Sequence, residues 1–283
     1  MTDRYAVIGH PVAHSQSPRI HAMFAQQTGQ DLSYQALLAP LDGFTACVQD
    51  FIGAGGRGAN VTVPFKEQAC HLSTRLSERA RMAGAANTLL FETNGMFGDN
   101  TDGAGMVRDI RHNLGRAIAG ARILLLGAGG AARGVILPLL LEHPAQLLIA
   151  NRSAQKAQIL ADFFARALAD MPAPLAAGQL PPRPQGCGLT DLAGRRFDLV
   201  INATSTGLNA TLLDIPGSVF APDCLAYEMV YGKQTPFMAQ ARSAAAKVSD
   251  GLGMLVEQAA AAFLLWRGVQ PDTAAVLKAL RCP

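Results

Sequence analysis

Side chains suited to holding a small hydroxylated acid are spread through the first third of the chain. Ser15 and Ser17 place two hydroxyls two residues apart, which puts them on the same side of an extended segment. A further hydroxyl, an ammonium, an amide and a carboxylate come from Thr62, Lys66, Asn87 and Asp102. Such groups can bind a carboxylate and several hydroxyls, and an ammonium beside a carboxylate can hold or move a proton.

Several of these residues also have a purely structural interpretation. Ser17 precedes Pro18 and is a possible helix N-cap, and Asp102 precedes Gly103 and is another. Asn87 closes an alanine-rich stretch and can satisfy a turn. Taken one at a time, the residue types leave both interpretations open.

A second kind of chemistry is indicated by a glycine-rich turn in the middle of the chain. The apolar run Leu124–Leu126 leads directly into the sequence G-A-G-G-A-A at residues 127–132, which then opens a helical pattern. Glycines here permit a tight turn and let backbone N–H groups approach a pyrophosphate at a helix N-terminus. The predicted dinucleotide-binding residues are Gly127, Ala128, Gly129, Gly130 and Ala131.

The end of the next predicted strand distinguishes NADP from NAD. An NAD site commonly has an acidic residue there, for the ribose 2′-hydroxyl. This chain instead has Asn151, Arg152 and Ser153, with Lys156 three residues on. Arg152 and Lys156 can hold a 2′-phosphate; the alternative is an ordinary basic start of a helix. A cation there is mildly unfavourable, so we expect an anion nearby and predict NADP as the cofactor.

The elements that must position these residues alternate between strands and helices, which predicts an α/β protein with parallel sheets. In the first part we expect strands at 5–9, 33–38 and 59–63, helices at 19–27 and 44–52, and a hairpin at 88–92 and 96–98. Thr62 then lies on a strand and Lys66 just beyond it.

The second part repeats the pattern around the glycine turn. We expect strands at 122–126, 147–150, 198–201 and 226–230, helices at 103–114, 131–142, 153–168, 252–267 and 273–280, and a proline-rich surface loop at 171–188. This gives one unit at about 1–102 and another at about 103–250. Periodicity alone does not assign the final helices to either.

Composition narrows the class of protein. The 283 residues carry 24 basic and 21 acidic side chains, and this small surplus argues against a nucleic-acid partner. We expect no membrane partner, because the longest apolar stretch, near 252–266, is too short to cross a bilayer. Five scattered cysteines and the lack of a signal-peptide pattern predict reduced thiols, a cytoplasmic location and no metal site.

Seven short motifs, in order, resemble the shikimate dehydrogenase family along nearly the whole chain. They are the serine loop at 11–18, N-V-T-V-P-F-K at 60–66, G-A-A-N-T at 84–88, G-D-N-T-D-G at 98–103, the glycine turn with Asn151–Ser153, N-A-T-S-T-G at 202–207, and G-L-G-M-L at 251–255 with Gln258.

The resemblance implies two α/β domains with the active site in a cleft between them. Residues 1–102 and 252–283 would form the substrate domain, and 103–251 a Rossmann-type NADP domain. Substrate would be held by Ser15, Ser17, Thr62, Lys66, Asn87, Asp102, Tyr231 and Gln258. The nicotinamide half of NADP would lie along Thr204, Ser205, Met229 and Gly251.

The implied reaction is the reversible reduction of 3-dehydroshikimate to shikimate by NADPH, with Lys66 and Asp102 as catalytic residues. Lys66 would stabilise charge on the ketone oxygen and deliver a proton, or would bind substrate only while water carries the proton. A quinate or related polyol dehydrogenase and a non-catalytic NADPH or metabolite sensor are the alternatives. The oligomeric state, monomer or homodimer, is left open.

Three positions depart from the family pattern. Glu228 stands where the family usually has Asp, Gly232 where Pro is common, and Lys156 where an Arg often assists the 2′-phosphate. The first two bear on the position of Tyr231. The third leaves the charge argument for NADP in place, because Lys156 is also a cation.

Overall fold

The structure is a computed structural model that describes residues 2–170, 181–206 and 211–281. The chain divides into two compact units. Unit 1 contains residues 1–106 and 255–283, and unit 2 contains residues 107–254. The chain therefore passes from one unit to the other within helix α5 (Asp102–Arg108) and near the start of helix α10 (Leu252–Arg267).

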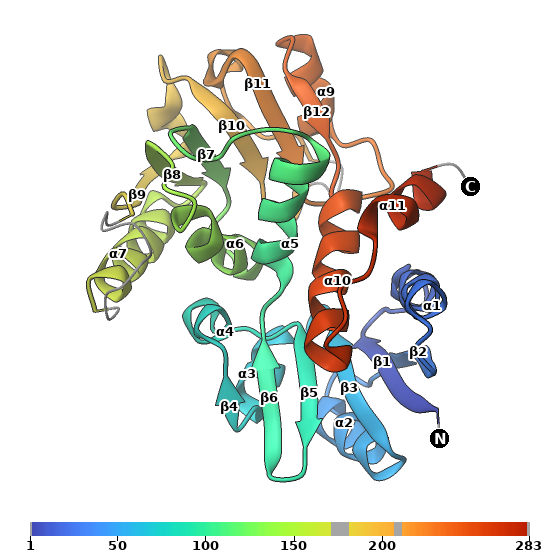
Figure 1. Cartoon of the computed structure of the whole chain (residues 1–283). Helices are drawn as coiled ribbons and strands as arrows, with labels where there is room; N and C mark the ends of the chain where they lie inside the picture. The colour runs from blue at the N-terminus through green and yellow to red at the C-terminus, as the bar shows by residue number, and fades with distance from the viewer. Residues whose placement is uncertain (1, 171–180, 207–210, 282–283) are drawn as a thin grey trace. The chain divides into compact units, whose positions relative to one another are not determined.

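Unit 1 has one sheet with helices on both faces (Figure 1). Its strands are β1 (Asp3–Gly9), β2 (Leu32–Leu38), β3 (Gly56–Val61), β4 (Arg75–Leu76), β5 (Thr88–Glu92) and β6 (Gly95–Asp99). Its helices, besides α5 and α10, are α1 (Ser17–Thr28), α2 (Phe44–Gly53), α3 (Lys66–Leu72), α4 (Glu78–Ala83) and α11 (Thr273–Arg281).

The sheet of unit 1 has the strand order β2-β1-β3-β5-β6-β4 and is mixed. Strands β2, β1 and β3 are parallel, as predicted. The predicted hairpin β5–β6 joins this sheet by pairing β5 antiparallel to β3, so the hairpin extends the parallel strands into a mixed sheet. A two-stranded hairpin is marginal alone, and the free edge of β3 offers its backbone groups partners.

Alternation along β1 gives the sheet of unit 1 two packed faces. Ala6 and Ile8 point into a core with residues of α2 and α3, including Phe44, Phe51 and Phe65. On the other face of the sheet, Tyr5 stacks on Trp266 of α10 with 4.7 Å between ring centroids. Helix α10 therefore covers unit 1 although it is separated from β1 by most of the chain.

Unit 2 has a fully parallel sheet of order β12-β11-β10-β7-β8-β9 (Figure 1). The strands are β7 (Arg122–Leu126), β8 (Gln146–Asn151), β9 (Gln185–Gly188), β10 (Phe197–Asn202), β11 (Phe220–Glu228) and β12 (Lys247–Ser249). Counted from β7, this is the order 3-2-1-4-5-6 of the Rossmann fold, whose ligands bind at the carboxyl ends of the strands where the order reverses. That point lies between β7 and β10.

Helices cover both faces of the parallel sheet. They are α6 (Gly130–Leu140), α7 (Ala154–Asp170) and α9 (Pro236–Ser243), with single helical turns at Asp109–Asn113, Leu189–Leu192 and Gly217–Val219. Leu124, Leu126 and Val200 on one face pack with Phe237 and Met238 of α9. Leu125, Ile149 and Ile201, which point to the other face, are equally buried. Such two-sided burial explains why these strands are continuous apolar runs.

The first unit differs from expectation after β3 and in its short elements. The strand expected to reach Val63 ends at Val61, because the Phe65 N–H bonds to the Thr62 carbonyl in a turn through Pro64. Thr62 is therefore one residue past β3, and Lys66 is the first residue of α3. Helices α3 and α4 and the short strand β4 were not predicted.

Unit 2 differs from expectation in several places, and its helix α9 and strand β12 were not predicted. The helix expected at 103–114 changes after α5 into a wider π-helical turn, with the Leu114 N–H bonded to the Asp109 carbonyl. The strand expected at 226–230 begins at Phe220 and ends at Glu228. The loop expected at 171–188 contains strand β9, whose Gly186 packs against the backbone of Gln158; residues 171–180 lie outside the described part.

Neither a membrane span nor a metal cluster is found in the part of the chain that the structure describes. No helix there is long and apolar enough to cross a bilayer. No group of three or more His, Cys, Asp or Glu side chains there could hold a metal ion.

Candidate functional site

The centre of the polar cluster in unit 1 is an ion pair between Lys66 and Asp102. Their Nζ and Oδ2 atoms are 2.6 Å apart, and the two side chains are 30% and 15% exposed. Each residue is the first of its helix, α3 and α5 respectively. A positive charge at a helix N-terminus is mildly unfavourable because of the helix dipole. The negative charge of Asp102 offsets this repulsion at Lys66.

Asn87 fixes the other oxygen of Asp102. Its Nδ2 donates to Asp102 Oδ1 at 2.8 Å, so the carboxylate is held between an ammonium and an amide. The Asn87 side chain is almost fully buried, and its Oδ1 accepts the Thr101 backbone N–H at 2.8 Å. Asn87 thus ties the start of β5 to the segment that carries Asp102, which is more than a local turn requires.

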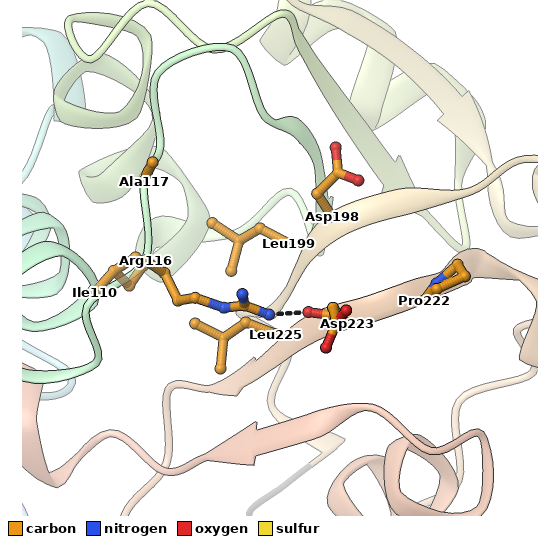
Figure 2. A pocket seen from close by; sticks show the side chains of 8 residues that line it. All are labelled: Ile110, Arg116, Ala117, Asp198, Leu199, Pro222, Asp223 and Leu225. Carbon is orange, nitrogen blue, oxygen red and sulfur yellow. Dashed lines mark hydrogen bonds between the residues drawn. The ribbon is translucent and has the colours of Figure 1, made fainter.

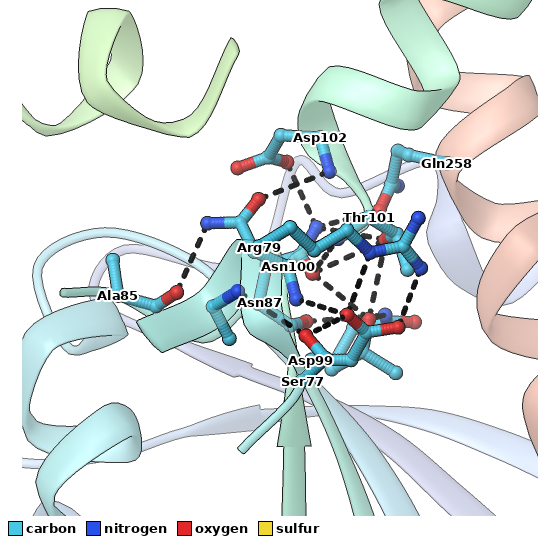
Figure 3. Close-up of polar contacts among 12 residues, drawn as sticks. Ser77, Arg79, Ala85, Asn87, Asp99, Asn100, Thr101, Asp102 and Gln258 are labelled. Carbon is cyan, nitrogen blue, oxygen red and sulfur yellow. Dashed lines mark hydrogen bonds and ion pairs between the residues drawn. The ribbon is translucent and has the colours of Figure 1, made fainter. Parts of the chain in front are cut away.

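Gln258 reaches the same cluster from α10. Its Oε1 accepts from Asn87 Nδ2 at 3.1 Å and from Thr101 Oγ1 at 3.3 Å, and its Nε2 donates to the Leu255 carbonyl. In Figure 3 the side chain of Gln258, which belongs to α10, points toward Asn87 and Thr101. The structure therefore brings together four predicted site residues from four elements: Lys66, Asn87, Asp102 and Gln258.

The segment before Asp102 is anchored by a second ion pair (Figure 3). Arg79 donates to both oxygens of Asp99, at 2.7 and 2.5 Å, and Ser77 Oγ donates to the same carboxylate. Burial raises the pKa of Asp99, but the bonds and charge of Arg79 outweigh burial, and the net pKa is lowered. The Asn100 side chain accepts the Asp102 N–H, and Asp102 is the first residue of α5 rather than its N-cap.

A chain of buried hydrogen bonds behind Asn87 was missed at the sequence level. Tyr34 Oη donates to Asn60 Oδ1 at 2.8 Å, and Asn60 Nδ2 donates to Thr88 Oγ1 at 3.1 Å. Thr88 in turn donates to Asn87 Oδ1 at 2.9 Å. Asn60 belongs to a motif singled out above, but only the pairing of β3 with β5 reveals that it supports Asn87.

Ser15 and Thr62 lie in loops of unit 1, and Ser17 begins helix α1. Ser15 Oγ accepts the Ser17 N–H at 3.2 Å, and Ser17 is the first residue of α1 and buried. The N-cap of α1 is Gln16, so the N-cap interpretation of Ser17 is wrong. The Thr62 N–H bonds to the Ile8 carbonyl, which holds Thr62 beside the end of β1.

The glycine turn of unit 2 lies where the sheet order reverses. Gly127 follows β7 with φ at +109°, and a Cβ there would lie 3.1 Å from the Ala203 carbonyl oxygen after β10. Gly129 is the N-cap of α6, no side chain caps this helix, and open space surrounds both Gly129 and Gly130. Ala128 precedes them, and Ala131 is in the first turn. An uncapped helix N-terminus in open space is suited to a phosphate.

Asn151, Arg152, Ser153 and Lys156 lie at the end of β8 and the start of α7. Ser153 Oγ accepts the Lys156 N–H, and Asn151 Nδ2 donates to the Ser153 carbonyl, so both shape the turn. Arg152 and Lys156 are exposed, and no carboxylate of the described chain pairs with either. Their positive charge is available to an anion.

The remaining predicted cofactor residues follow the ends of β10, β11 and β12. Thr204 and Ser205 come after β10, and Met229 comes after β11. Gly251 packs so tightly that an added Cβ would lie 2.2 Å from the Met229 carbonyl oxygen. Tyr231, predicted to bind substrate, is a half-buried residue of unit 2, whereas the cluster around Lys66 belongs to unit 1.

A pocket of about 250 Å³ in unit 2 is separate from these residues (Figure 2). Arg116, Asp198, Pro222 and Asp223 are among the residues that line it. Arg116 precedes β7, and the other three lie in the amino-terminal halves of β10 and β11. Because parallel sheets of this kind bind ligands at the carboxyl ends, the predicted cofactor residues form the better candidate site.

Together, the sheet order, the glycine turn and the polar cluster define a class: an oxidoreductase that uses a dinucleotide. The chain belongs to the shikimate dehydrogenase family. Family models match it at residues 7–89 (shikimate dehydrogenase substrate binding domain), 109–177 (shikimate/quinate 5-dehydrogenase) and 251–281 (shikimate 5′-dehydrogenase C-terminal domain).

Individual relatives agree with the family models. The chain is 59% identical over 283 residues to the shikimate dehydrogenase (NADP(+)) of Dechloromonas aromatica, covering 99% of this chain and 98% of the relative. It resembles the crystal structure of an Ael1 enzyme from Pseudomonas putida, with 47% identity, a TM-score of 0.90 and coverage of 100% and 99%. The shikimate 5-dehydrogenase of Thermus thermophilus, crystallised with NADP(H) and shikimate, is 33% identical, with a TM-score of 0.84 and 99% of both chains covered.

Proposed function

We propose that this protein catalyses the reaction 3-dehydroshikimate + NADPH + H⁺ ⇌ shikimate + NADP⁺, a step of the shikimate pathway toward chorismate and the aromatic amino acids. The observation that carries the proposal is the Lys66–Asp102 ion pair, held by Asn87 within a buried polar cluster. A sensor that only binds its ligands has no need of this pair.

Lys66 is the residue proposed to act on the reacting oxygen. Its ammonium stabilises negative charge that develops on the ketone oxygen, and Nζ donates the proton that makes the hydroxyl. Asp102 holds the ammonium in place through Oδ2, and Asn87 prevents the carboxylate from rotating through Oδ1. NADPH, when bound, supplies the hydride.

Unit 1 is proposed as the substrate domain. Ser15 and Ser17 offer hydroxyls, Thr62 offers another just past β3, and Gln258 offers an amide. Such neutral donors and acceptors suit the carboxylate and hydroxyls of a small cyclic acid. Tyr231 of unit 2 is proposed to contact the substrate as well.

Unit 2 is proposed as the NADP domain, and its residues fit that cofactor. The open, uncapped start of α6 suits the pyrophosphate, and Gly127–Ala131 would hold it. Arg152 and Lys156 would hold the 2′-phosphate, beside Asn151 and Ser153. Thr204, Ser205, Met229 and Gly251 would line the nicotinamide half.

A steady-state assay with four combinations tests the function: shikimate or quinate, each with NADP or NAD. We expect shikimate with NADP to give the highest kcat/KM. Higher kcat/KM with quinate would make the protein a quinate dehydrogenase, and binding without turnover of any pair would make it a sensor. The cytoplasmic location and the oligomeric state, monomer or homodimer, stay predictions.

A further inference from the structure

Glu228, the last residue of β11, carries a fully buried carboxylate. No lysine, arginine or histidine of the described residues forms an ion pair with it. A buried carboxylate is costly unless hydrogen bonds replace water, so its donors must be neutral groups held in fixed places. The proposed mechanism does not use this residue.

Three neutral donors surround the Glu228 carboxylate. Asn202 Nδ2 and Thr235 Oγ1 each donate to Oε2 at 2.8 Å, and the Val230 N–H donates to Oε1 at 3.1 Å. Asn202 is the register partner of Glu228 on β10, and Thr235 is the N-cap of α9. One side chain therefore joins the end of β10, the segment after β11 and the start of α9.

The contact with Glu228 sets the orientation of the Asn202 amide. Because Nδ2 faces the carboxylate, Oδ1 faces the opposite way and accepts from the Thr204 N–H at 3.1 Å and from Thr204 Oγ1 at 2.7 Å. If the amide turned over, its NH₂ group would face the Thr204 N–H and that bond would be lost, and the Thr204 hydroxyl would have to change from donor to acceptor. The conformation of residues 202–204 thus depends on Glu228.

The segments after β10 and β11, which contain Thr204 and Met229, pack closely against two glycines. A Cβ on Gly127 would lie 3.1 Å from Thr204 Cγ2, and a Cβ on Gly251 would lie 2.2 Å from the Met229 carbonyl oxygen. The Met229 N–H also bonds to the Asn202 carbonyl. A shift of residues 203–204 would consequently alter their packing against Gly127, and a shift of Met229 would alter its packing against Gly251.

We propose that Glu228 is a positioning residue for the nicotinamide half of the cofactor, which it serves by fixing the Asn202 amide and, through it, Thr204 and Met229. This inference rests on the proposed function of unit 2. It predicts that Glu228 matters for binding of the whole dinucleotide and not for binding of its adenosine 2′-phosphate end, which is assigned to Arg152 and Lys156.

The first test is Glu228→Gln, which keeps the shape of the side chain and replaces one acceptor oxygen by a donor. Two probes are titrated: NADPH, by its nicotinamide fluorescence, and adenosine 2′,5′-bisphosphate, by calorimetry. We expect the Kd of NADPH to rise about tenfold, within the range for a charge-assisted hydrogen bond, and the Kd of the bisphosphate to stay within about twofold. The matched control is Asp214→Asn, an exposed carboxylate of the same unit, which should change neither value.

The second test is the double variant Glu228→Gln with Asn202→Asp, which exchanges the amide and the carboxylate between the two positions. The amide introduced at position 228 can donate to the carboxylate introduced at position 202, which still accepts from Thr204, and the Thr235 hydroxyl can rotate to accept. We expect NADPH affinity to return to within about threefold of the parent. This variant also provides the test if Glu228→Gln alone does not fold, as judged by its melting temperature.

Three results would overturn the proposal. They are parent-like NADPH affinity in Glu228→Gln, an equal loss for both probes in a folded Glu228→Gln, and a double variant no better than the sum of its single changes. A parent protein that binds the bisphosphate but turns over none of the four substrate and cofactor pairs would contradict the proposed function instead. The two failures are therefore distinguishable.

Discussion

The two oxygens of the Asp102 carboxylate have different hydrogen-bond partners within unit 1. Oδ2 bonds to Lys66 and Oδ1 to Asn87, so the carboxylate is fixed from both sides. Both Lys66 and Asp102 keep some exposure, whereas Asn87 is buried. The reactive groups thus face outward from a rigid support.

Replacing Lys66 by Ala should lower kcat by a factor of about 10²–10⁴, the range for a lost general acid–base group. The KM for shikimate should change much less, because the other side chains proposed to bind substrate would still hold it. Steady-state kinetics measures both, with Lys278→Ala on the exposed side of α11 as control. If kcat stays within a few-fold of the parent, Lys66 only binds substrate and water carries the proton.

Replacing Arg152 by Ala should weaken NADPH binding by roughly 10- to 150-fold and leave NADH binding nearly unchanged. The reason is that only NADPH carries the 2′-phosphate that the unpaired guanidinium would hold. Fluorescence titration with each cofactor provides the measurement, and Arg196→Ala, an exposed arginine before β10, is the control. Equal losses for NADPH and NADH would mean that Arg152 supports the turn after β8.

At the scale of elements, α1, β2 and α10 meet around one buried histidine. The His21 ring stacks on Tyr34, with 4.2 Å between centroids, and lies 5.4 Å from Trp266. Neither ring nitrogen has a hydrogen-bond partner among the described residues. Burial lowers the pKa of His21 from 6.5 to about 3, so the ring is neutral in the folded protein.

Stability should therefore fall in mild acid. The unfolded chain takes up a proton on His21 below about pH 6.5 and the folded chain does not, so the stability present above pH 6.5 is lost as pH falls toward 3. From pH 7.5 to pH 5 this amounts to about 2 kcal/mol of unfolding free energy. Urea unfolding followed by the fluorescence of Trp266, the only tryptophan, measures it.

The variant His21→Phe isolates this contribution, because it keeps a flat ring against Tyr34 and cannot take up a proton. Its unfolding free energy should differ between pH 7.5 and pH 5 by about 2 kcal/mol less than that of the parent. A variant with the full parental difference would show that other groups cause the pH dependence.

Some of these elements could be predicted from the sequence and others could not. Strands such as β7 and β8 are predictable because burial on both faces makes them uninterrupted apolar runs. Strand β9 is not, since its residues Gln185–Gly188 are held by close approach to α7 rather than by apolar side chains. Lys66, Asn87 and Asp102 were found from their types and motifs, but the support of Asn87 by Tyr34, Asn60 and Thr88 depends on strand pairing.

At the scale of the whole molecule, the proposed reaction requires that ligands bound by unit 1 and unit 2 reach each other. Hydride transfer needs the reacting atoms about 3–3.5 Å apart and shielded from water. We expect the radius of gyration to fall when NADP and shikimate bind together, compared with either ligand alone. Solution scattering on the three complexes and the free protein measures this, and an unchanged radius would indicate a rigid, preformed site.

The discontinuity of unit 1 has a consequence for how the protein is made. Residues 107–254 leave the ribosome as one uninterrupted piece, so unit 2 can fold while synthesis continues. Unit 1 must wait for α10, which supplies Trp266 to cover Tyr5 and Gln258 to complete the cluster around Asn87. Until then the Tyr5 side of the first sheet is covered by α1 without the aromatic rings of α10. The part of the protein that is translated first is therefore completed last.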